Sequence, residues 1–292
     1  MVWSETRLTG SGSRVVIGRE RSTVVIGGLG ARHGSGGLAA MLGQADLDVI
    51  AQEAAAQVRA GADVLEVCVS GAGRDETTYL PQVVKAVARS VTVPLCICAK
   101  APEALDAALA NCPGKPVAYL VDQQTGPWQD FLAVAARRGA AVIAQGLEPH
   151  GVPEGLDERI EVTRRVLREA IAAGVAREDV IVDPVVLPVA EYEGAAAQAL
   201  RLIAHVAQID AINMTVRVGS LSSGLPANGD LDHLFMARAV AAGVTCLMVD
   251  DVAAARGFAL MSDVLLGREG ALSRYRDFAR ETHGAATAQL AF

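Results

Sequence analysis

The feature that most restricts the fold of this chain is a unit that recurs along it: a helical pattern, a glycine at its end, and then a short apolar run. The unit is found at residues 59–65, 138–143 and 242–247. Glycine in this position adopts the left-handed conformation that ends a helix, because it has no Cβ to clash. An apolar run without alternating polar residues is typical of a strand covered on both faces, as in a parallel sheet. The repeated unit therefore predicts alternating helices and strands.

Eight apolar segments fit the strands of such a fold, at residues 23–27, 64–69, 94–98, 116–121, 140–145, 179–183, 211–216 and 245–249. Helical patterns accompany them, at 46–60, 76–90, 102–111, 127–138, 157–173, 192–207, 231–242 and 252–266. Eight alternations in 292 residues predict a (β/α)8 TIM barrel, a fold of about 250 residues, with a doubly wound open sheet as the alternative. No linker or change in composition divides the chain, so residues 1–292 are expected to form a single domain. Residues 1–18 are expected to form a short N-terminal hairpin that closes the barrel floor.

The helix at 157–173 has the clearest pattern, with Asp157 at its start and Gly174 at its end. Its apolar positions form one stripe, and its charged residues lie on the other face. The residues of the stripe are Ile160, Val166, Leu167, Ala170 and Ile171.

Composition excludes several classes of function. Hydrophobic residues make up 51% of the chain, aromatic residues 4%, and the net charge is −7 without a cluster of Lys and Arg. This argues for a large packed core and against binding to nucleic acid or an anionic membrane surface. No apolar run reaches the ~20 residues of a membrane span, and the N-terminus lacks the apolar stretch of a signal peptide. Five cysteines, an odd number, indicate reduced thiols in a cytoplasmic protein.

The segment 179–188 places one carboxylate at the end of a buried strand. Val180 to Val182 form the strand, Asp183 follows it, and Pro184 cannot donate to a strand ladder, so pairing should stop there. In parallel α/β proteins, ligands bind at this end of the strands. Asp183 is therefore expected to face a binding site, the alternative being a solvated turn residue that caps the next helix.

Polar side chains at the other strand ends should face the same site. By the period-two alternation of strands, Glu66, Cys68 and Ser70 share one face, as do Cys96 and Cys98. The remaining positions are Lys100, Tyr119, Asp122, Gln123, Gln145, Glu148, His150, Asn213, Thr215 and Arg217. The Asp250–Asp251 pair also follows a strand, but it is more typical of a helix N-cap.

The residue types at these strand ends also raise three other chemistries: zinc binding, a Schiff-base lysine and phosphate binding. Cys68, Cys98, Glu66 and Asp183 have the donor types of a zinc site, but they lack the short spacings of zinc motifs, so no metal site is predicted. Lys100 is interpreted as a surface lysine that pairs with Glu103, in preference to a Schiff-base amine. The glycine-rich loop 27–34 resembles a phosphate-binding loop, but its spacing differs from that of the dinucleotide fingerprint, so it is interpreted as a flexible active-site loop in preference to a phosphate site.

Several of these segments resemble methyltetrahydrofolate:corrinoid methyltransferases, which belong to a pterin-binding group that includes dihydropteroate synthase and a domain of cobalamin-dependent methionine synthase. The similarity covers about residues 14–270, and segment 179–188 is its most specific part. The other similar segments, in the same order along the chain, are 61–67, 93–97, 104–116, 142–153 with the helix that follows it to Gly174, and 223–245.

The resemblance implies a TIM barrel, usually a homodimer, that transfers the N5-methyl group of a tetrahydrofolate to the cobalt of a cobalamin carried by a partner corrinoid protein. Carboxylates and amides accept hydrogen bonds from the pterin 2-amino and N3–H groups, because an unpaired buried donor costs about 1–3 kcal/mol. A proton or a strong hydrogen bond at N5 makes the leaving amine neutral.

Carried over by residue, the resemblance gives Asp183 the role of the pterin-binding aspartate, and Glu66 keeps the carboxylate of the second strand. Gln145 and Thr215, taken from their positions on the strands, are also predicted to bind the substrate. Three family positions carry other residues here: Cys68 replaces an asparagine, Cys98 an aspartate and Tyr119 an asparagine. In the first strand, Gly27–Ala31 replaces Gly-Glu-Arg-Ile-Asn. The asparagine expected to reach N5 falls near Ser220, close to Arg217, and these two are the predicted catalytic residues.

At least four polar anchors thus differ, and four lost partners at about 1 kcal/mol each would weaken pterin binding roughly a thousandfold unless others compensate. Three hypotheses stay open. The first is a methyltransferase of this type with an altered pterin site. The second is a barrel that acts on another small molecule, and the third is a non-catalytic partner subunit.

Overall fold

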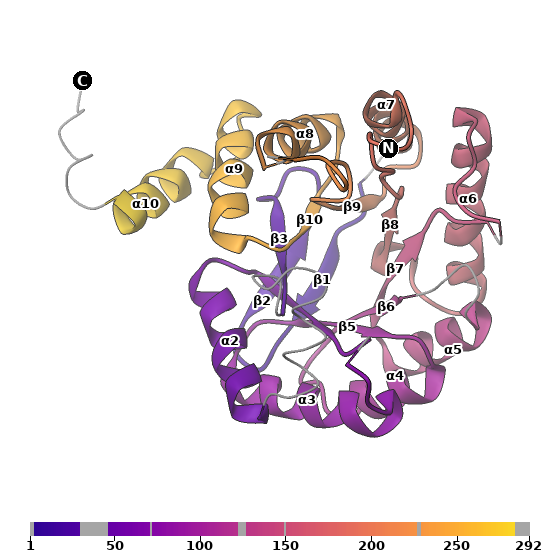
Figure 1. Cartoon of the computed structure of the whole chain (residues 1–292), viewed down its shortest axis with the longest axis vertical. Coiled ribbons are helices and arrows are strands. Elements are labelled where there is room, and N and C mark those ends of the chain that lie inside the picture. The colour runs from indigo at the N-terminus through magenta and orange to yellow at the C-terminus, as the bar shows by residue number, and fades with distance from the viewer. Residues whose placement is uncertain are drawn as a thin grey trace.

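The computed structural model describes residues 3–29, 46–70, 72–121, 127–148, 150–226 and 229–283. Its centre is a closed barrel of eight parallel strands in the order β10-β3-β4-β5-β6-β7-β8-β9 (Figure 1). This confirms the predicted TIM barrel and excludes the open sheet. The strands are β3 (Val24–Gly28), β4 (Val64–Cys68), β5 (Leu95–Ala99), β6 (Val117–Leu120), β7 (Ala141–Gln145), β8 (Val180–Asp183), β9 (Asn213–Arg217) and β10 (Cys246–Val249).

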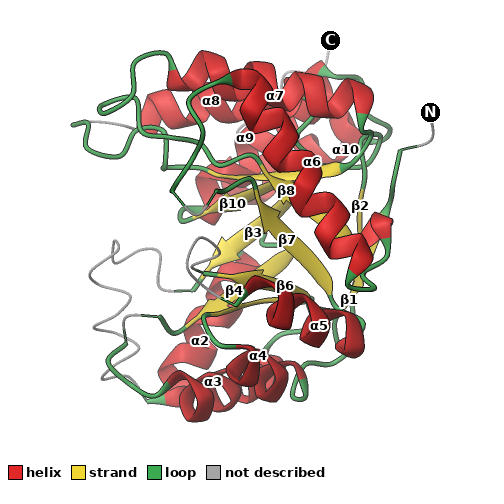
Figure 2. Cartoon of the chain, turned by 90° about the vertical axis from the view of Figure 1, so that its right-hand side faces the viewer, coloured by secondary structure: helices red, strands yellow, loops and turns green. Residues whose placement is uncertain are grey.

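Helices surround the strands on the outside, so that in a side view the strands lie between layers of helix (Figure 2). They are α2 (Leu47–Arg59), α3 (Glu76–Ser90), α4 (Pro102–Leu109), α5 (Trp128–Arg138), α6 (Leu156–Ala172), α7 (Ala195–Ile209), α8 (Gly229–Ala242) and α9 (Val252–Leu265). Each matches a predicted helix to within three residues. The glycines of the recurring unit have the expected role: Gly139 caps α5 with φ +67°, and Gly243 has φ +131°.

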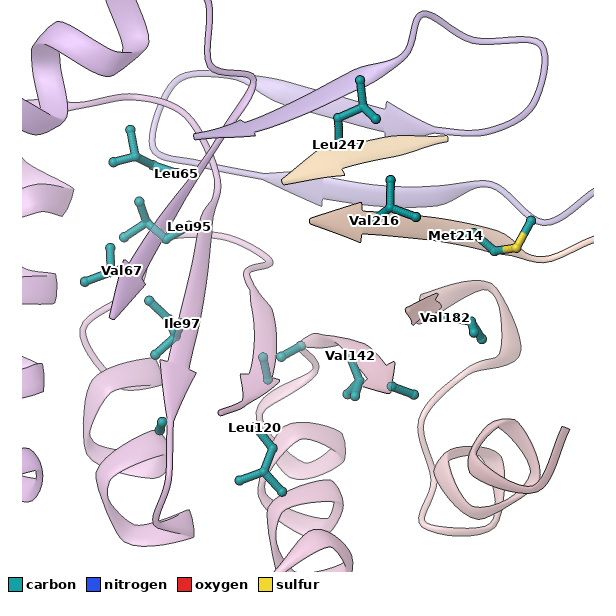
Figure 3. Packing of buried hydrophobic residues seen from close by; sticks show 14 of the residues in the cluster. Leu65, Val67, Leu95, Ile97, Leu120, Val142, Val182, Met214, Val216 and Leu247 are labelled. Carbon is teal, nitrogen blue, oxygen red and sulfur yellow. The ribbon is translucent and has the colours of Figure 1, made fainter. Parts of the chain in front are cut away.

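Strand side chains divide into two buried clusters by alternation. One cluster joins strand residues to helix residues and is therefore the layer between barrel and helices. Figure 3 shows strand members of this layer, among them Leu65, Ile97 and Val216. The other cluster contains strand and hairpin residues, such as Ile26, Cys96 and Met248, and no helix residue, so it fills the barrel interior.

An N-terminal hairpin closes the barrel floor, as predicted. It consists of the antiparallel strands β1 (Thr6–Thr9) and β2 (Arg14–Ile17), and Leu8 and Ile17 are fully buried in the interior cluster. Asn213, at the start of β9, donates hydrogen bonds to Thr6 Oγ1 (3.0 Å) and to the carbonyl of Ile17 (3.2 Å).

Three details differ from the predictions. In α6, Ile171 is 39% exposed and does not belong to the buried stripe, which instead contains Arg159 and Val162. Helix α7 begins three residues late, because its cap Gly194 is left-handed with φ +78°. An additional helix, α10 (Ala271–His283), follows the eighth unit and lies beyond α9, away from the barrel (Figure 1).

No helix within the described ranges is long and apolar enough to cross a membrane.

Candidate active site at the barrel mouth

Seven of the predicted site residues lie on the inner side of six consecutive strands, at their carboxyl ends. Glu66 and Cys68 come from β4, Cys98 from β5, Tyr119 from β6, Gln145 from β7, Asp183 from β8 and Arg217 from β9. Direct contacts connect them in two groups: Glu66 with Cys98 and Arg217, and Tyr119 with Gln145 and Asp183. Closure of the barrel therefore brings together side chains that are up to 151 positions apart in sequence.

The first group is centred on an ion pair across the barrel. Arg217 Nη2 donates to Glu66 Oε1 at 2.5 Å, and Glu66 is only 6% exposed. The Glu66 carboxylate is the largest influence on Arg217 and raises its pKa further above the usual range, so the guanidinium is always charged. Arg217 Nη2 also lies 4.0 Å from Met248 Sδ. The pair thus fixes a positive group at the mouth and satisfies one acceptor oxygen of Glu66.

The second group is centred on Asp183, which is 5% exposed. Its Oδ1 accepts a hydrogen bond from the Val185 amide at 2.9 Å, and the Gln145 side chain hydrogen-bonds to the carboxyl group. Burial raises the pKa of Asp183, and these hydrogen bonds and the charge of Arg217 only partly oppose it. The alternative role as a helix cap is wrong, since α7 has Gly194 as its N-cap. Asp183 is a buried acid that has no cation in direct contact among the described residues.

Tyr119 adds a hydroxyl that stays protonated at neutral pH. Burial raises the pKa of Tyr119 well above its usual value, and the nearby Asp183 carboxylate acts in the same direction. Gln145 Nε2 donates to Tyr119 Oη at 2.8 Å. The phenolic hydrogen is therefore available to an acceptor, which makes Tyr119 a neutral donor beside the acid.

Two thiols lie next to Glu66. Cys68 and Cys98 are direct partners in the register of β4 and β5, and the Cys98 thiol donates to Glu66 Oε1 at 3.1 Å. A hydrogen bond from Cys98 lowers the pKa of Cys68, whereas burial raises that of Cys98 well above its usual value. Across the described ranges, no group of three or more His, Cys, Asp or Glu side chains is arranged to hold a metal ion.

These thiols lead to a testable difference in reactivity. All five cysteines are free, but only Cys68 and Cys112 are partly exposed. The pKa of Cys68 is lowered from its ordinary value of 9.0, whereas burial raises the pKa of Cys112 to about 12. Cys68 therefore has at least roughly a thousandfold more thiolate, partly offset by its weaker intrinsic nucleophilicity. Brief treatment with limiting iodoacetamide at pH 8 should label Cys68 roughly 30-fold faster than Cys112, as measured by peptide mass spectrometry. Equal labelling of the two would contradict the assigned environment of Cys68.

Several predicted positions lie elsewhere. Thr215 is fully buried in the interior below Arg217, and its Oγ1 has no hydrogen-bond partner among the described residues. Ser220 is half-buried in the turn after β9 and takes no part in either group. Asn213 is at the floor and not at the mouth, since β9 begins there. Lys100 is exposed, which argues against a Schiff-base role. Asp122, Gln123 and residues 30–34 of the glycine-rich loop lie outside the described residues.

The Asp250–Asp251 pair separates into two roles. Asp251 is the N-cap of α9 and accepts from the Ala254 amide at 3.1 Å, as predicted. Asp250 instead faces the mouth: a Cβ placed on Gly28 would lie 3.7 Å from Asp250 Oδ1 and 3.4 Å from Glu66 Oε2. Both acids therefore border Gly28. The alternation of side chains along β10 is consistent with this position, because it places Asp250 on the inner side of the barrel with Cys246 and Met248.

A surface hollow of about 640 Å³ lies outside this ring of residues. It is lined by the segment after β7 and by the outer face of α6, including Glu148, Glu158 and Arg165. Arg165 is held there by Glu148 (2.7 Å) and by the carbonyl of Leu147 (3.0 Å). Of the polar strand-end positions expected at the site, Glu148 and His150 line this hollow instead.

Solved structures with the same architecture include dihydropteroate synthase from Yersinia pestis, with a TM-score of 0.65 at 18% identity over 89% of this chain and 98% of that one. Dihydropteroate synthase from Xanthomonas albilineans in complex with 7,8-dihydropteroate gives a TM-score of 0.67 at 17% identity, over 89% of this chain and 99% of that one. At this level of identity the likeness concerns the fold alone.

Sequence relatives include a methyltransferase and a methionine synthase. The chain is 24% identical over 230 residues to the methylcorrinoid:tetrahydrofolate methyltransferase of Eubacterium limosum, covering 77% of this chain and 85% of the relative. It is 25% identical over 178 residues to the methionine synthase of Mycobacterium tuberculosis, covering 59% of this chain but only 15% of that protein. The family described as Pterin binding enzyme matches residues 39–255. This chain therefore belongs to the family of pterin binding enzymes.

Proposed function

We propose that the protein binds a tetrahydrofolate at the barrel mouth and transfers a methyl group between this folate and the cobalamin of a partner corrinoid protein. The observation that carries the proposal is Asp183, a buried acid at the end of β8 that no cation of the described part of the chain contacts. Membership of the pterin binding family and the similarity to the Eubacterium limosum methyltransferase supply the substrate class.

The pterin edge fits the second group of residues. Its 2-amino and N3–H groups are donors, and a buried ionised carboxylate needs donors to offset its lost hydration. One oxygen of Asp183 is already held by Val185, so the carboxylate has a fixed direction. Tyr119 supplies a protonated hydroxyl beside it. A bound pterin would therefore stabilise the charged form of Asp183, and binding should lower the pKa of this residue.

The first group of residues would serve the reacting end of the folate. Loss of a methyl group from N5 leaves electron density on this nitrogen, and a fixed cationic donor stabilises it as it develops. Arg217 is such a donor, because Glu66 holds it in one place. Ser220, three residues further along the turn, is the other proposed N5 contact. Cobalamin on the partner would supply the cobalt that accepts or donates the methyl group.

The altered mouth also favours a second candidate, a barrel that binds a different ligand. Glu66 is already neutralised by Arg217, and the uncharged thiol of Cys98 donates to it. Tyr119, in the second group, is also uncharged. These substitutions make the mouth less acidic than a site lined by several free carboxylates. A neutral, partly apolar small molecule would suit it.

We further propose a cytoplasmic homodimer. The five free thiols are consistent with a reducing compartment. On α8, Leu231 and Leu234 are 36% and 67% exposed, and they offer an apolar face to a second copy.

Calorimetry with tetrahydrofolate tests the proposed binding, and methyl transfer from 5-methyltetrahydrofolate to cob(I)alamin, followed by absorbance, tests the activity. Saturable binding with one site per chain and turnover with the cobalt acceptor are expected. Binding without transfer would support a non-catalytic role. Absence of both would contradict the proposal and favour a different ligand.

A further inference from the structure

The turn that follows Asp183 has an unusual backbone. Val185 has φ +54°, and within the described ranges only Val185 and Ala211 combine a side chain with a positive φ. A β-branched residue is strained in this region, because its Cβ and γ carbons crowd the backbone. Surrounding contacts must therefore hold Val185 in place. The turn is directly coupled to the site, since the Val185 amide is the group that donates to Asp183 Oδ1 at 2.9 Å.

The contacts that hold this turn come from Arg159 on α6. Arg159 Nη2 donates to the carbonyls of Pro184 (2.7 Å) and Val185 (2.6 Å), and Nη1 donates to Gln198 Oε1 on α7 (2.9 Å). Arg159 is only 1% exposed and forms no ion pair with the described residues. Its Nε has no hydrogen-bond partner among them. A buried guanidinium without a carboxylate partner is unfavourable for stability alone.

We propose that Arg159 is a positioning residue for the pterin site: it clamps the two carbonyls of the Pro184–Val185 turn so that the Val185 amide holds the Asp183 carboxylate in one orientation. Arg159 does this from outside the barrel, without touching the ligand. The inference rests on the proposed function, because Asp183 is the group that is positioned. The positive charge of Arg159 has a second effect: it partly opposes the rise in the pKa of Asp183 that burial causes.

A merely structural role predicts something different. Through Gln198, Arg159 also links α6 to α7, so its removal would lower stability even if the turn were unaffected. The strain at Val185 separates the two roles. Glycine adopts φ +54° without cost, so Val185→Gly should make the clamp largely dispensable. Val185→Ala is the matched control, since it removes the same branched side chain but keeps the Cβ that disfavours this conformation.

Arg159→Met should weaken tetrahydrofolate binding about tenfold or more, with a larger effect on KM than on kcat. Arg159→Lys keeps the positive charge but loses the planar set of guanidinium donors, so its affinity should lie between those of the unmodified protein and Arg159→Met. If Arg159→Met does not fold, Arg159→Lys takes its place in the comparison. Adding Val185→Gly to Arg159→Met should recover most of the affinity, whereas adding Val185→Ala should not. Arg165→Met, on the same helix but facing the surface hollow, should leave binding unchanged.

Hydrogen exchange of the peptide that contains Val185 provides a readout without ligand. Arg159→Met should speed exchange of the Val185 amide, and Val185→Gly in the same chain should slow it again. If the unmodified protein does not bind folate, the proposed function fails, while this exchange pattern still reports whether the clamp exists. Unchanged exchange and affinity in Arg159→Met, or a loss of affinity that Val185→Gly does not repair, would overturn the inference.

Discussion

Replacement of Asp183 by asparagine is expected to weaken tetrahydrofolate binding roughly 10- to 150-fold, because a hydrogen bond to a charged group contributes about 1.5–3 kcal/mol. The same change should make the ligand-free protein more stable at neutral pH. Asparagine retains an oxygen for the Val185 amide but has no charge to desolvate. Opposite effects on binding and on stability are typical of a residue kept for function.

The direction of the stability effect follows from linkage. Burial raises the pKa of Asp183 above its ordinary value of 3.8, so the folded state binds this proton more tightly than the unfolded chain. The free energy of unfolding therefore falls as the pH rises through the interval between the pKa of Asp183 in the unfolded chain and its raised pKa in the folded protein. Above the raised pKa the full cost of the buried charge is present, and at pH values below both pKa values it is absent. The gain in stability from Asp183→Asn should accordingly shrink as the pH is lowered through this interval.

Thermal unfolding of both proteins between pH 3 and pH 8 (chosen to span roughly this interval) measures the effect, and calorimetry measures the affinity. Asp179→Asn is a matched control, because Asp179 is also buried, lies just before the opposite end of β8, and forms an ion pair with Lys115. That variant should lose stability and keep its affinity. A fall in stability for Asp183→Asn at neutral pH would show that Asp183 has a structural role instead.

Much of the barrel was predictable because its determinants are local. Strands covered on both faces need continuous apolar runs, and the helix-ending glycines mark where each strand follows. Alternation then places Glu66, Cys68 and Cys98 on the inner side, as found. Helix α10 was not predicted, since the eighth unit already completes the barrel and nothing in the repeat requires another element.

What the sequence could not show depends on contacts between distant elements. Helical periodicity puts Arg159 with the charged residues of α6, and its burial results from the turn after β8, which is strained only in three dimensions. Asn213 has the right alternation for the mouth, but β9 starts two residues later than predicted, which leaves it at the floor. The pairing of Glu66 on β4 with Arg217 on β9 requires closure of the barrel through β3 and β10, which lie between these two strands.

Removal of the Glu66–Arg217 ion pair should also have a large effect. The loss of stability should depend on which of the two partners is replaced. Arg217→Met leaves the Glu66 carboxylate buried without a cation, which should cost about 2–3 kcal/mol of stability, less than for a fully buried pair because the Arg217 side chain is 34% exposed. Glu66→Gln leaves a guanidinium that can still reach water, so about 1 kcal/mol is expected. The double variant should be more stable than the sum of the two losses predicts, because no charge is then left unpaired.

Activity should separate the two partners further. If Arg217 stabilises the charge that develops at N5, Arg217→Met should lower kcat roughly 100-fold, the scale of losing one preorganised donor. Glu66→Gln keeps this donor and should lower kcat less. Arg256→Met is the matched control, since Arg256 forms a comparable ion pair with Asp63 (2.9 Å) that involves none of the mouth residues. It should reduce stability and spare kcat. A normal kcat in folded Arg217→Met would assign the Glu66–Arg217 pair to structure alone, and the donor at N5 would then have to be sought at Ser220 or Tyr119.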